Sequence, residues 1–229
     1  MRGRGLMIAS HLTEQLSIAS KRAGGSRVSA MLPVERAESE DPSTAIGYRG
    51  LLPEEHEADD GFFPREPFLR ALTVELAHLV DIEHGPVASE RLITGVGGSV
   101  GGHMEDAYRA DRSLEGRLRP EQIADLYVGL KSAIGGDFYV VSIDDERIVL
   151  GNRKCPFGDA VKHAPSLCRM TSSVFGAIAA RNSDSEVAVH LEERIAVGDP
   201  ECRVVVWLGN PPPELEPFVH RYRAELAND

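Results

Sequence analysis

The sequence predicts an α+β fold, in which N-terminal helices precede a β-β-α-β-β unit that forms an antiparallel sheet. Apolar residues recur at helical spacing as far as about residue 133, and from Phe138 onward the pattern changes to an alternation of apolar and polar residues. One further helical stretch, residues 165–181, separates two pairs of alternating segments. Helices packed against one antiparallel sheet are the simplest arrangement for this order of elements.

Three helices are expected before the sheet. The first carries Pro67 in its first turn, where a missing N–H group costs nothing, and it ends at the His-Gly-Pro sequence of residues 84–86. The second covers residues 86–108, and the third covers residues 120–134, with proline at its start and two glycines after its end. Their apolar faces are expected to pack on the sheet or on one another.

Four strands and one helix form the predicted sheet unit. Acidic residues 144–146 and the Gly-Asp-Pro-Glu sequence of residues 198–201 are typical of tight turns between paired strands. In chain order, the predicted elements are Phe138–Ile143, Arg147–Leu150, Pro165–Arg181, Val187–Leu191 and Cys202–Leu208. A short C-terminal helix is expected from Glu214, after three consecutive prolines.

The N-terminal part of the chain differs in composition from the rest. Residues 1–31 carry five basic groups against one acid, whereas residues 32–62 carry nine acids against two arginines. Residues 6–19 fit one short amphipathic helix, but residues 38–60 have too few large apolar groups to offset the entropy lost on ordering. We therefore expect residues 1–62 to be a disordered tail and residues 63–229 to be a single α+β domain.

Composition excludes several classes of protein. The 229 residues have a hydrophobic fraction of 42% and a formal charge of −11, which disfavours a nucleic-acid partner. There is no apolar run long enough to cross a membrane and no signal-peptide pattern, so we expect a cytoplasmic protein without a membrane partner. Three cysteines are too few for a disulfide framework and are better interpreted as reduced thiols or ligands.

A run of glycines interrupts the second predicted helix. Gly97 and Gly101, like Gly98 and Gly102, are four residues apart and so share one side of the helix. Each glycine inside a helix costs about 1 kcal/mol relative to alanine, which indicates that a helix or a ligand lies unusually close to this bare side. The four glycines are therefore candidate residues for binding a cofactor or small molecule, or for a homodimer face.

The predicted topology brings the three cysteines together. Cys155 begins the loop after the second strand, Cys168 lies in the first turn of the following helix, and Cys202 follows the last turn at the same edge of the sheet. A helix N-terminus lowers the pKa of a thiol, which favours the thiolate of Cys168. Side chains with a possible fourth donor at this edge are His163, Glu192, Glu193 and Asp199, of which His163 and Glu193 are the preferred candidates.

Three sulfur ligands with one nitrogen or oxygen suit tetrahedral zinc, and three cysteines also suit an iron–sulfur cluster. The cofactor expected is therefore zinc or an iron–sulfur cluster, held by Cys155, Cys168 and Cys202 with His163 or Glu193. The long intervals between the cysteines are not diagnostic of a metal site. The alternative that three small buried residues hold no ligand stays open.

Enzymatic motifs are weak in this sequence. Residues 97–101 match G-x-S-x-G, and Asp199 and His220 follow Ser99 in the order a hydrolase needs. That motif belongs after a central strand of a parallel sheet, whereas only a tail and one helix precede it here. A thiol- or metal-dependent enzyme that uses Cys168 with His163 is the remaining catalytic alternative, and we assign no catalytic residue.

Three segments with distinctive residues carry a family resemblance. They are Asn152-Arg153-Lys154-Cys155-Pro156-Phe157-Gly158, Ala164-Pro165-Ser166-Leu167-Cys168 and Gly198-Asp199-Pro200-Glu201-Cys202. In these segments the sequence resembles the methanogen output domain family and, more remotely, the 4-vinyl reductase sensor domains, over roughly residues 66–209. The resemblance implies an α+β module that senses a small molecule or redox state and works with signalling proteins.

The resemblance also implies a metal site. The related vinyl reductase domains hold structural zinc through a helix cysteine, a glutamate and two cysteines of the final hairpin. Cys168 and Cys202 match two of those positions, but Arg194 or Ile195 stands in the region of the first hairpin cysteine. Cys155 is an extra thiol that supplies a third sulfur in this sequence.

These observations favour a non-catalytic sensory or regulatory domain. It is expected to bind a small molecule or sense redox state through its cysteine site, and to signal to a partner protein in trans, because the chain has no DNA-binding motif or kinase signature. A homodimer is expected. The alternatives are an enzyme and a structural interaction module with inert cysteines, and the sequence identifies neither the ligand nor the partner.

Overall fold

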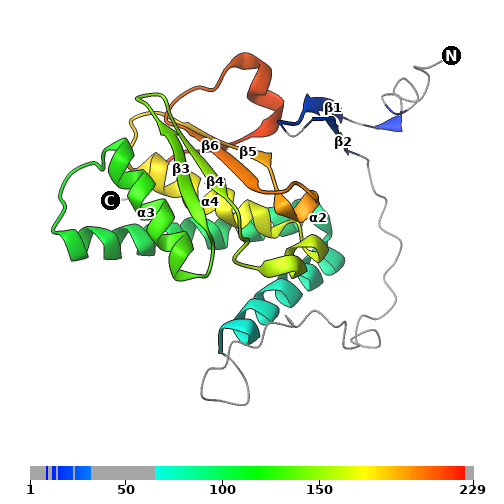
Figure 1. Ribbon diagram of the computed structural model, residues 1–229, viewed down its shortest axis with the longest axis horizontal. Helices are drawn as coiled ribbons and strands as arrows, with labels where there is room; N and C mark the ends of the chain where they lie inside the picture. Colours follow the sequence, from blue (N-terminus) through cyan, green and yellow to red (C-terminus); the bar gives the residue numbers. More distant parts are fainter. Residues whose placement is uncertain (1–8, 10–11, 14, 23, 32–64, 225–229) are drawn as a thin grey trace. The chain divides into compact units, whose positions relative to one another are not determined.

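The computed structural model describes residues 9, 12–13, 15–22, 24–31 and 65–224 (Figure 1). The chain divides into two compact units, one ending at Gly47 and the other beginning at Tyr48. Most described residues of the first unit belong to an antiparallel hairpin of strands β1 (Gln15–Ser20) and β2 (Ser26–Met31). The second unit contains α2 (Arg65–Arg112), the helices and strands that follow it, and all three cysteines.

The hairpin corrects one prediction from the sequence. Residues 15–19 belong to a strand and not to the expected amphipathic helix, and Ile18 pairs with Val28 across the hairpin. Gly24 and Gly25 have φ values of 88° and 87°, which suit a tight turn between the strands. The helical pattern of residues 6–19 was misleading because β2, the strand that pairs with β1, lies outside that stretch. Residues 38–60, which were predicted to be disordered, lie outside the described residues.

Helix α2 (Arg65–Arg112) contains the first two predicted helices. They meet at Gly85, whose φ of 73° and ψ of 165° are not helical and which breaks α2 at the predicted place. A φ in this range favours glycine over any residue with a side chain. None of the described helices is both long enough and apolar enough to span a bilayer.

The second unit is an α+β arrangement, as predicted. After α2 come α3 (Pro120–Ala133), β3 (Phe138–Ile143), β4 (Arg147–Asn152), the 3₁₀ helix η2 (Gly158–His163), α4 (Leu167–Arg181), β5 (Val187–Glu193), the 3₁₀ helix η3 (Ile195–Val197) and β6 (Cys202–Trp207). Together with β7 (Val219–Tyr222), these strands form an antiparallel sheet in the order β3-β4-β6-β5-β7. Helices α3 and α4 cover one face of the sheet, and α2 packs against α4 (Figure 1).

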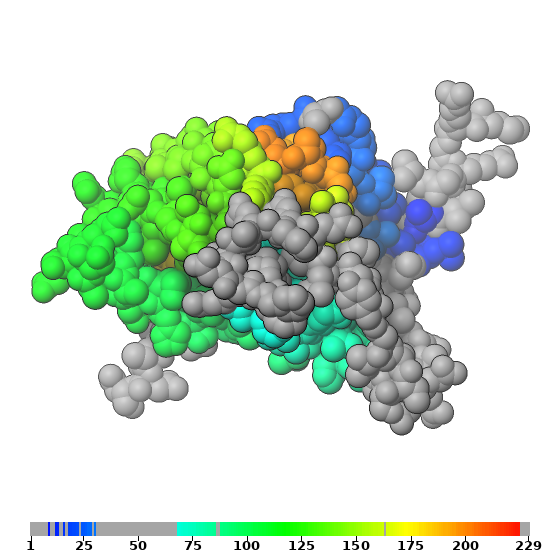
Figure 2. Space-filling view, turned by 60° about the horizontal axis from the view of Figure 1, so that its bottom comes forward, coloured from blue at the N-terminus to red at the C-terminus, as the bar shows by residue number. Residues whose placement is uncertain are grey.

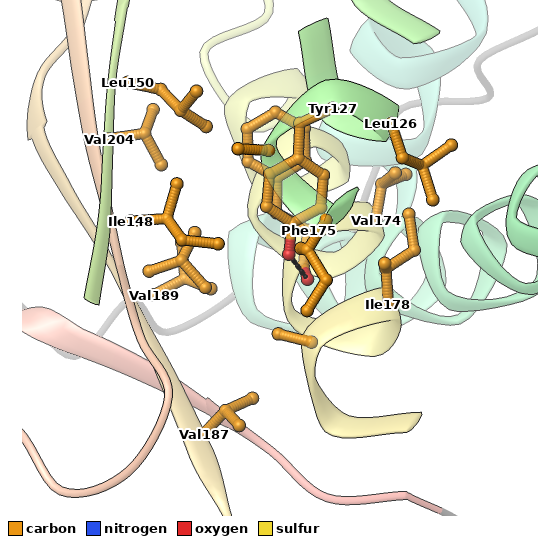
Figure 3. Packing of buried hydrophobic residues seen from close by; sticks show 14 of the residues in the cluster. Leu126, Tyr127, Ile148, Leu150, Val174, Phe175, Ile178, Val187, Val189 and Val204 are labelled. Atoms are coloured by element: carbon orange, nitrogen blue, oxygen red, sulfur yellow. Dashed lines mark hydrogen bonds between the residues drawn. The ribbon is translucent and has the colours of Figure 1, made fainter. Parts of the chain in front are cut away.

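The core lies between the sheet and helices α3 and α4 (Figure 3). Tyr127 of α3 stacks on Phe175 of α4 with ring centroids 4.0 Å apart, and both are fully buried. The Tyr127 hydroxyl donates a hydrogen bond of 2.6 Å to the Phe175 carbonyl oxygen. Ile148 and Val189 from the sheet pack on the same cluster, so α4 is held against the sheet at its centre.

The C-terminus adds a strand that the sequence analysis did not predict. The expected helix from Glu214 is replaced by a short 3₁₀ helix, η4 (Pro213–Phe218), followed by strand β7 (Val219–Tyr222). Pro217 inside η4 has no N–H group to continue a helix, and the following residues pair with β5. The predicted four-stranded sheet therefore has five strands.

Strand β7 introduces a buried histidine with a consequence for acid stability. Burial lowers the pKa of His220 to about 3, and the positive charges of Arg169, Arg194 and His190 act in the same direction. Unfolded histidine titrates near pH 6.5, so the unfolded chain binds more protons between about pH 3 and pH 6.5. The contribution of neutral His220 to the free energy of unfolding is therefore fully present above about pH 6.5 and is lost as the pH falls toward 3.

We expect the thermal unfolding midpoint to fall between pH 7 and pH 4, and to fall less in His220→Gln. Thermal unfolding followed by circular dichroism at a series of pH values measures the midpoint of the wild type and of His220→Gln. His84→Gln, which changes an exposed histidine of α2, is the matched control and should keep the wild-type pH dependence. Equal pH dependence in wild type and His220→Gln would contradict the assignment.

Candidate functional site

The three cysteines line one small cavity, as the predicted topology requires. Cys155 lies in the loop after β4, Cys168 is the second residue of α4, and Cys202 is the first residue of β6. The cavity has a volume of about 30 Å³ and lies between the sheet edge and the start of α4. All three side chains belong to its lining, together with Phe138, Asn152, Glu193 and Arg194.

Burial makes the thiols weak acids. It raises the pKa of Cys155 to about 11 and that of Cys168 to about 12, and it also raises the pKa of Cys202. The prediction that the N-terminus of α4 favours the thiolate of Cys168 is therefore wrong. Loss of hydration on burial raises the pKa of this thiol by more than the helix end can lower it. The thiols become good ligands or nucleophiles only where a positive charge compensates for burial.

Hydrogen-bond donors surround two of the sulfurs. The Ile195 backbone N–H donates to Sγ of Cys202 at 3.4 Å, and the side chain of Asn152, paired with Cys202 across β4 and β6, donates to the same sulfur. The backbone N–H of Phe157 donates to Cys155. Such donors favour the thiolate form and are typical of sulfur atoms that bind a metal.

Among the predicted fourth donors whose side chains are described, Glu193 lines the cavity. It is 3% exposed, lines the cavity and ends β5 opposite Arg203 of β6. His163 is the last residue of η2, and its side chain is outside the described residues. Within the described part of the chain, no three His, Cys, Asp or Glu side chains are arranged closely enough to hold a metal ion as they stand.

The two other acidic candidates have structural roles. Glu192 forms an ion pair with Arg203 at 2.8 Å. Asp199 is buried, and its Oδ2 accepts a 2.8 Å hydrogen bond from the backbone N–H of Arg194. Asp199 therefore fixes the turn that positions Cys202, and neither carboxylate lines the cavity.

Sequence reasoning missed the basic side chains that act on the thiols. Lys131 at the end of α3 is 3% exposed, and its Nζ donates to Oγ1 of Thr171, a cavity residue, at 2.8 Å. Burial lowers the pKa of Lys131 to about 8, while the three cysteines act in the opposite direction. None of the ion pairs among the described residues includes Lys131.

Arg194 is the second such group. It lines the cavity, and its charge lowers the pKa of both Cys168 and Cys202. Its Nε is buried and makes no hydrogen bond among the described residues. Two cations thus face three thiols at a buried site, an arrangement that favours negative charge on sulfur.

The glycine run serves helix packing at two of its four positions. A Cβ on Gly101 would lie 2.9 Å from the Val174 carbonyl oxygen of α4, and a Cβ on Gly97 would overlap Ser173. The close neighbour predicted for this side is therefore helix α4. Contact with α4 explains Gly97 and Gly101, and ligand or dimer contact at these two glycines stays a prediction.

The other positions of the run are not filled by α4 backbone. A Cβ on Gly98 would meet open space, and one on Gly102 would lie 2.8 Å from Nη1 of Arg181. None of the four glycines lines the cysteine cavity, and ligand contact at Gly98 and Gly102 stays a prediction. Ser99 is exposed within α2 beside an antiparallel sheet, so the strand–turn–helix context of a hydrolase elbow is missing at this residue.

The cysteine site is packed directly on α2. Val74, Ala77 and Ile93 of α2 form one buried cluster with residues of η2 and α4, and Cys155 and Cys168 pack against it. The hydroxyl of Ser166, just before α4, donates to Oδ2 of Asp81 at 2.7 Å. The cysteine site is therefore linked by packing contacts to both parts of α2.

A second pocket, of about 390 Å³, lies at the far end of the β3–β4 hairpin. It is lined by residues 145–146 and 207–212, which include two acids, Trp207 and two prolines. It contains none of the site residues that the sequence predicted. Its size suits a small molecule better than the cysteine cavity does.

The solved structures that are similar to this chain include the following two. One is the phenol-responsive sensory domain of the transcription activator PoxR with phenol, which is 14% identical, with a TM-score of 0.52 over 60% of this chain and 73% of that chain. The other is a trafficking protein particle complex subunit 3 from Naegleria fowleri, covalently bound to palmitic acid. It is 13% identical, with a TM-score of 0.46 over 63% of this chain and 95% of that one. The first likeness shows a shared fold.

The family assignment comes from the sequence of the second unit. The family model of methanogen output domain 1 matches residues 74–207, which include α2 from Val74, the cysteine site and most of the sheet. No curated protein matches the sequence significantly. The match covers more than half of the chain and contains all three cysteines, and the chain therefore belongs to the methanogen output domain 1 family.

Proposed function

We propose that this protein is a non-catalytic sensory or regulatory domain whose cysteine site holds one divalent metal ion, with zinc as the preferred ion. Cys155, Cys168, Cys202 and Glu193 would be its ligands, and these side chains would have to move closer together than they stand to hold it. The observation that carries the proposal is the gathering of these four side chains, from four separate segments, around one cavity. The sensory role of the structurally similar phenol-responsive domain supports the regulatory part of the proposal.

The size of the cavity favours a single ion over other ligands. About 30 Å³ is room for one or two water-sized groups, whereas an aromatic ring or an iron–sulfur cluster needs several times that space. Three sulfurs and one oxygen are also a ligand set that zinc accepts in tetrahedral geometry. A small molecule of the size of phenol would require this site to open.

The charges around the cavity favour an anionic metal–thiolate centre. Three thiolates and the Glu193 carboxylate carry four negative charges, so a bound divalent ion would leave a net charge of −2 at the site. Lys131 and Arg194 together supply two positive charges that balance it. A buried lysine without a carboxylate partner is otherwise costly. Bound zinc would supply a cross-link between the sheet, α4 and the loop of Cys155, and it would compensate for the burial that raises the pKa values of these thiols.

The packing supports a route from the site to the surface of the domain. Cys168 belongs to α4, which packs on α2 through Gly97 and Gly101, so loss or oxidation of a ligand would loosen the contact between the two helices. A partner protein that binds α2 or α4 would detect this change. The weak acidity of the thiols disfavours the alternative of a thiol-dependent enzyme that works without a metal.

Zinc titration of variants tests the proposal. Cys155→Ser, Cys168→Ser and Cys202→Ser are each expected to bind Zn²⁺ at least about 100-fold more weakly, because each removes a ligand. Lys131→Met is expected to weaken binding about 10- to 100-fold, because it removes a charge that supports the ligands. Competition with a chromophoric chelator measures both effects, and circular dichroism establishes that each variant is folded.

Ser173→Ala is the matched control, because Ser173 is buried in α4 but does not line the cavity. It should bind Zn²⁺ like the wild type. Wild-type affinity in a folded Cys168→Ser variant would refute the metal site. If removal of zinc left hydrogen exchange in α4 and residues 86–112 unchanged, the site would be structural and the sensory part of the proposal would fail.

A further inference from the structure

Helix α2 exposes an unusual amount of apolar surface. Of the sixteen large hydrophobic residues that are exposed among the described residues, nine belong to α2. Four of them follow each other at intervals of four residues, with exposed fractions of 54%, 52%, 40% and 41%: Leu92, Val96, Val100 and Met104. We call these four residues the α2 stripe. Part of α2 is visible at the surface in the space-filling view of Figure 2.

The stripe is separate from the face of α2 that packs on α4. The residues that follow Leu92, Val96, Val100 and Met104 are buried, and two of them are Gly97 and Gly101, which contact α4. The stripe therefore lies beside this interface and faces away from the core. A contiguous exposed apolar patch on a helix marks an interaction site.

We propose that the α2 stripe is a homodimer interface, in which α2 of a second copy lies antiparallel across the stripe, with the two-fold axis at the level of Gly98. In a two-fold interface each contact occurs twice. About this level Leu92 faces Met104 and Val96 faces Val100, so the stripe matches itself residue by residue. This interface does not depend on a metal at the cysteines.

The charges of α2 are consistent with self-association. The chain has a net charge of −11, yet there is no Asp or Glu between Arg91 and Met104. Two stripes can therefore approach without repulsion between acids.

Small side chains next to the stripe permit close contact between helices. A Cβ on Gly95 would meet open space, and Ser99 is exposed on the same face. Small residues at such positions let two helix backbones approach. A membrane surface is a poorer occupant, because helices that bind anionic lipid are rich in Lys and Arg, whereas residues 91–104 contain only Arg91 and His103 as basic residues.

Light scattering coupled to size-exclusion chromatography tests the proposal with the full chain. The wild type is expected to be a dimer at micromolar concentration, and Val96→Asp is expected to be a folded monomer, because it places a charge in the centre of the interface. Ile134→Asp changes an exposed apolar residue at the end of α3 and should remain a dimer. A monomeric wild type, or a dimeric Val96→Asp, would overturn the proposal.

Oxidative cross-linking tests the antiparallel arrangement without disturbing the stripe. At 1.5 Å rise per residue, Ser99 lies about 3 Å along the axis from its counterpart and Ala107 about 27 Å from its counterpart. Ser99→Cys should form a disulfide-linked dimer and Ala107→Cys should not, each measured above the wild-type background from the three native cysteines. Cross-linking of Ala107→Cys but not of Ser99→Cys would overturn the arrangement.

Discussion

Glu105→Ala is expected to destabilise the protein by about 3–5 kcal/mol, because Glu105 is a buried charge that holds several polar groups. Its Oε1 accepts hydrogen bonds from Nε of Arg109 at 2.8 Å and from Nδ2 of Asn182 at 2.9 Å, and its Oε2 pairs with Arg181 at 3.1 Å. The substitution takes away the acceptor that these three side chains share, although Asn182 keeps a hydrogen bond to the Ile178 carbonyl oxygen and Arg181 keeps its ion pair with Asp106. Chemical denaturation measures the loss.

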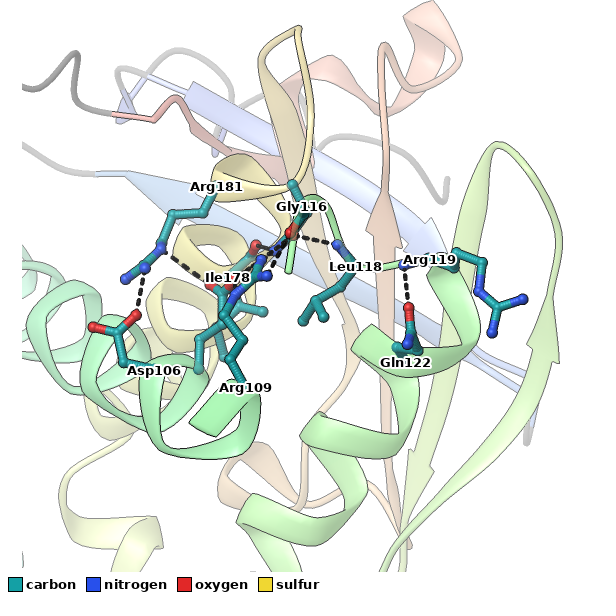
Figure 4. Close-up of polar contacts among 10 residues, drawn as sticks. Asp106, Arg109, Gly116, Leu118, Arg119, Gln122, Ile178 and Arg181 are labelled. Carbon is teal, nitrogen blue, oxygen red and sulfur yellow. Dashed lines mark hydrogen bonds and ion pairs between the residues drawn. The ribbon is translucent and has the colours of Figure 1, made fainter. Parts of the chain in front are cut away.

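The same cluster holds the connection between α2 and α3 (Figure 4). Oδ1 of Asn182 accepts hydrogen bonds from the Leu118 backbone N–H and from Arg109, both at 2.7 Å, and Arg109 also donates to the Gly116 carbonyl oxygen. Glu105→Ala should therefore increase hydrogen exchange in residues 113–119 as well.

Asp106→Ala is the matched control for Glu105→Ala. Asp106 also pairs with Arg181, at 2.6 Å, but its side chain is 61% exposed, so the expected loss is at most about 1 kcal/mol. Equal losses in the free energy of unfolding for Glu105→Ala and Asp106→Ala would show that the burial of Glu105 does not determine how much this cluster stabilises the protein.

Gly101→Leu is expected to cost about 3 kcal/mol, because α2 and α4 touch at this position. The Cβ alone would lie 2.9 Å from the carbonyl oxygen and 3.3 Å from Cα of Val174, and backbone atoms cannot move away as a flexible side chain can. The larger side chain would push the two helices apart, and overpacking of this kind costs about 1–3 kcal/mol. Thermal and chemical unfolding measure the change.

Gly98→Ala, three residues earlier in the same helix, has the opposite expected effect. Its Cβ would meet open space, so the better helix propensity of alanine should stabilise the protein by up to about 1 kcal/mol. Destabilisation of similar size by Gly98→Ala and Gly101→Leu would indicate that the glycines matter for another reason than contact with α4.

Local signals in the sequence were sufficient for most of the fold. The break at Gly85 follows from His-Gly-Pro, and the gathering of the cysteines follows from the order of strands and helix, although their spacing is not diagnostic. Strand β7 was missed because its stability comes from pairing with β5, and no local pattern of four residues announces such a partner. The N-terminal hairpin was missed for the same reason.

The chemistry of the site was less predictable than its position. The helix end was expected to lower the pKa of Cys168, but burial raises it. The degree of burial is a property of the whole fold, so a local sequence pattern does not give the direction of the pKa shift. Lys131 was overlooked, although it follows Ile123 and Tyr127 on the buried row of α3 at intervals of four residues. A lysine on an apolar row is a signal that a sequence alone can provide.

The most direct test of the central claim is the metal content of anaerobically purified protein, with X-ray absorption spectroscopy of the bound metal. The proposal predicts one divalent ion per chain, no acid-labile sulfide, and three sulfur ligands at about 2.3 Å with one oxygen or nitrogen at about 2.0–2.2 Å. A protein that carries no metal and binds no added Zn²⁺, or one with iron and sulfide in equal amounts, would contradict it.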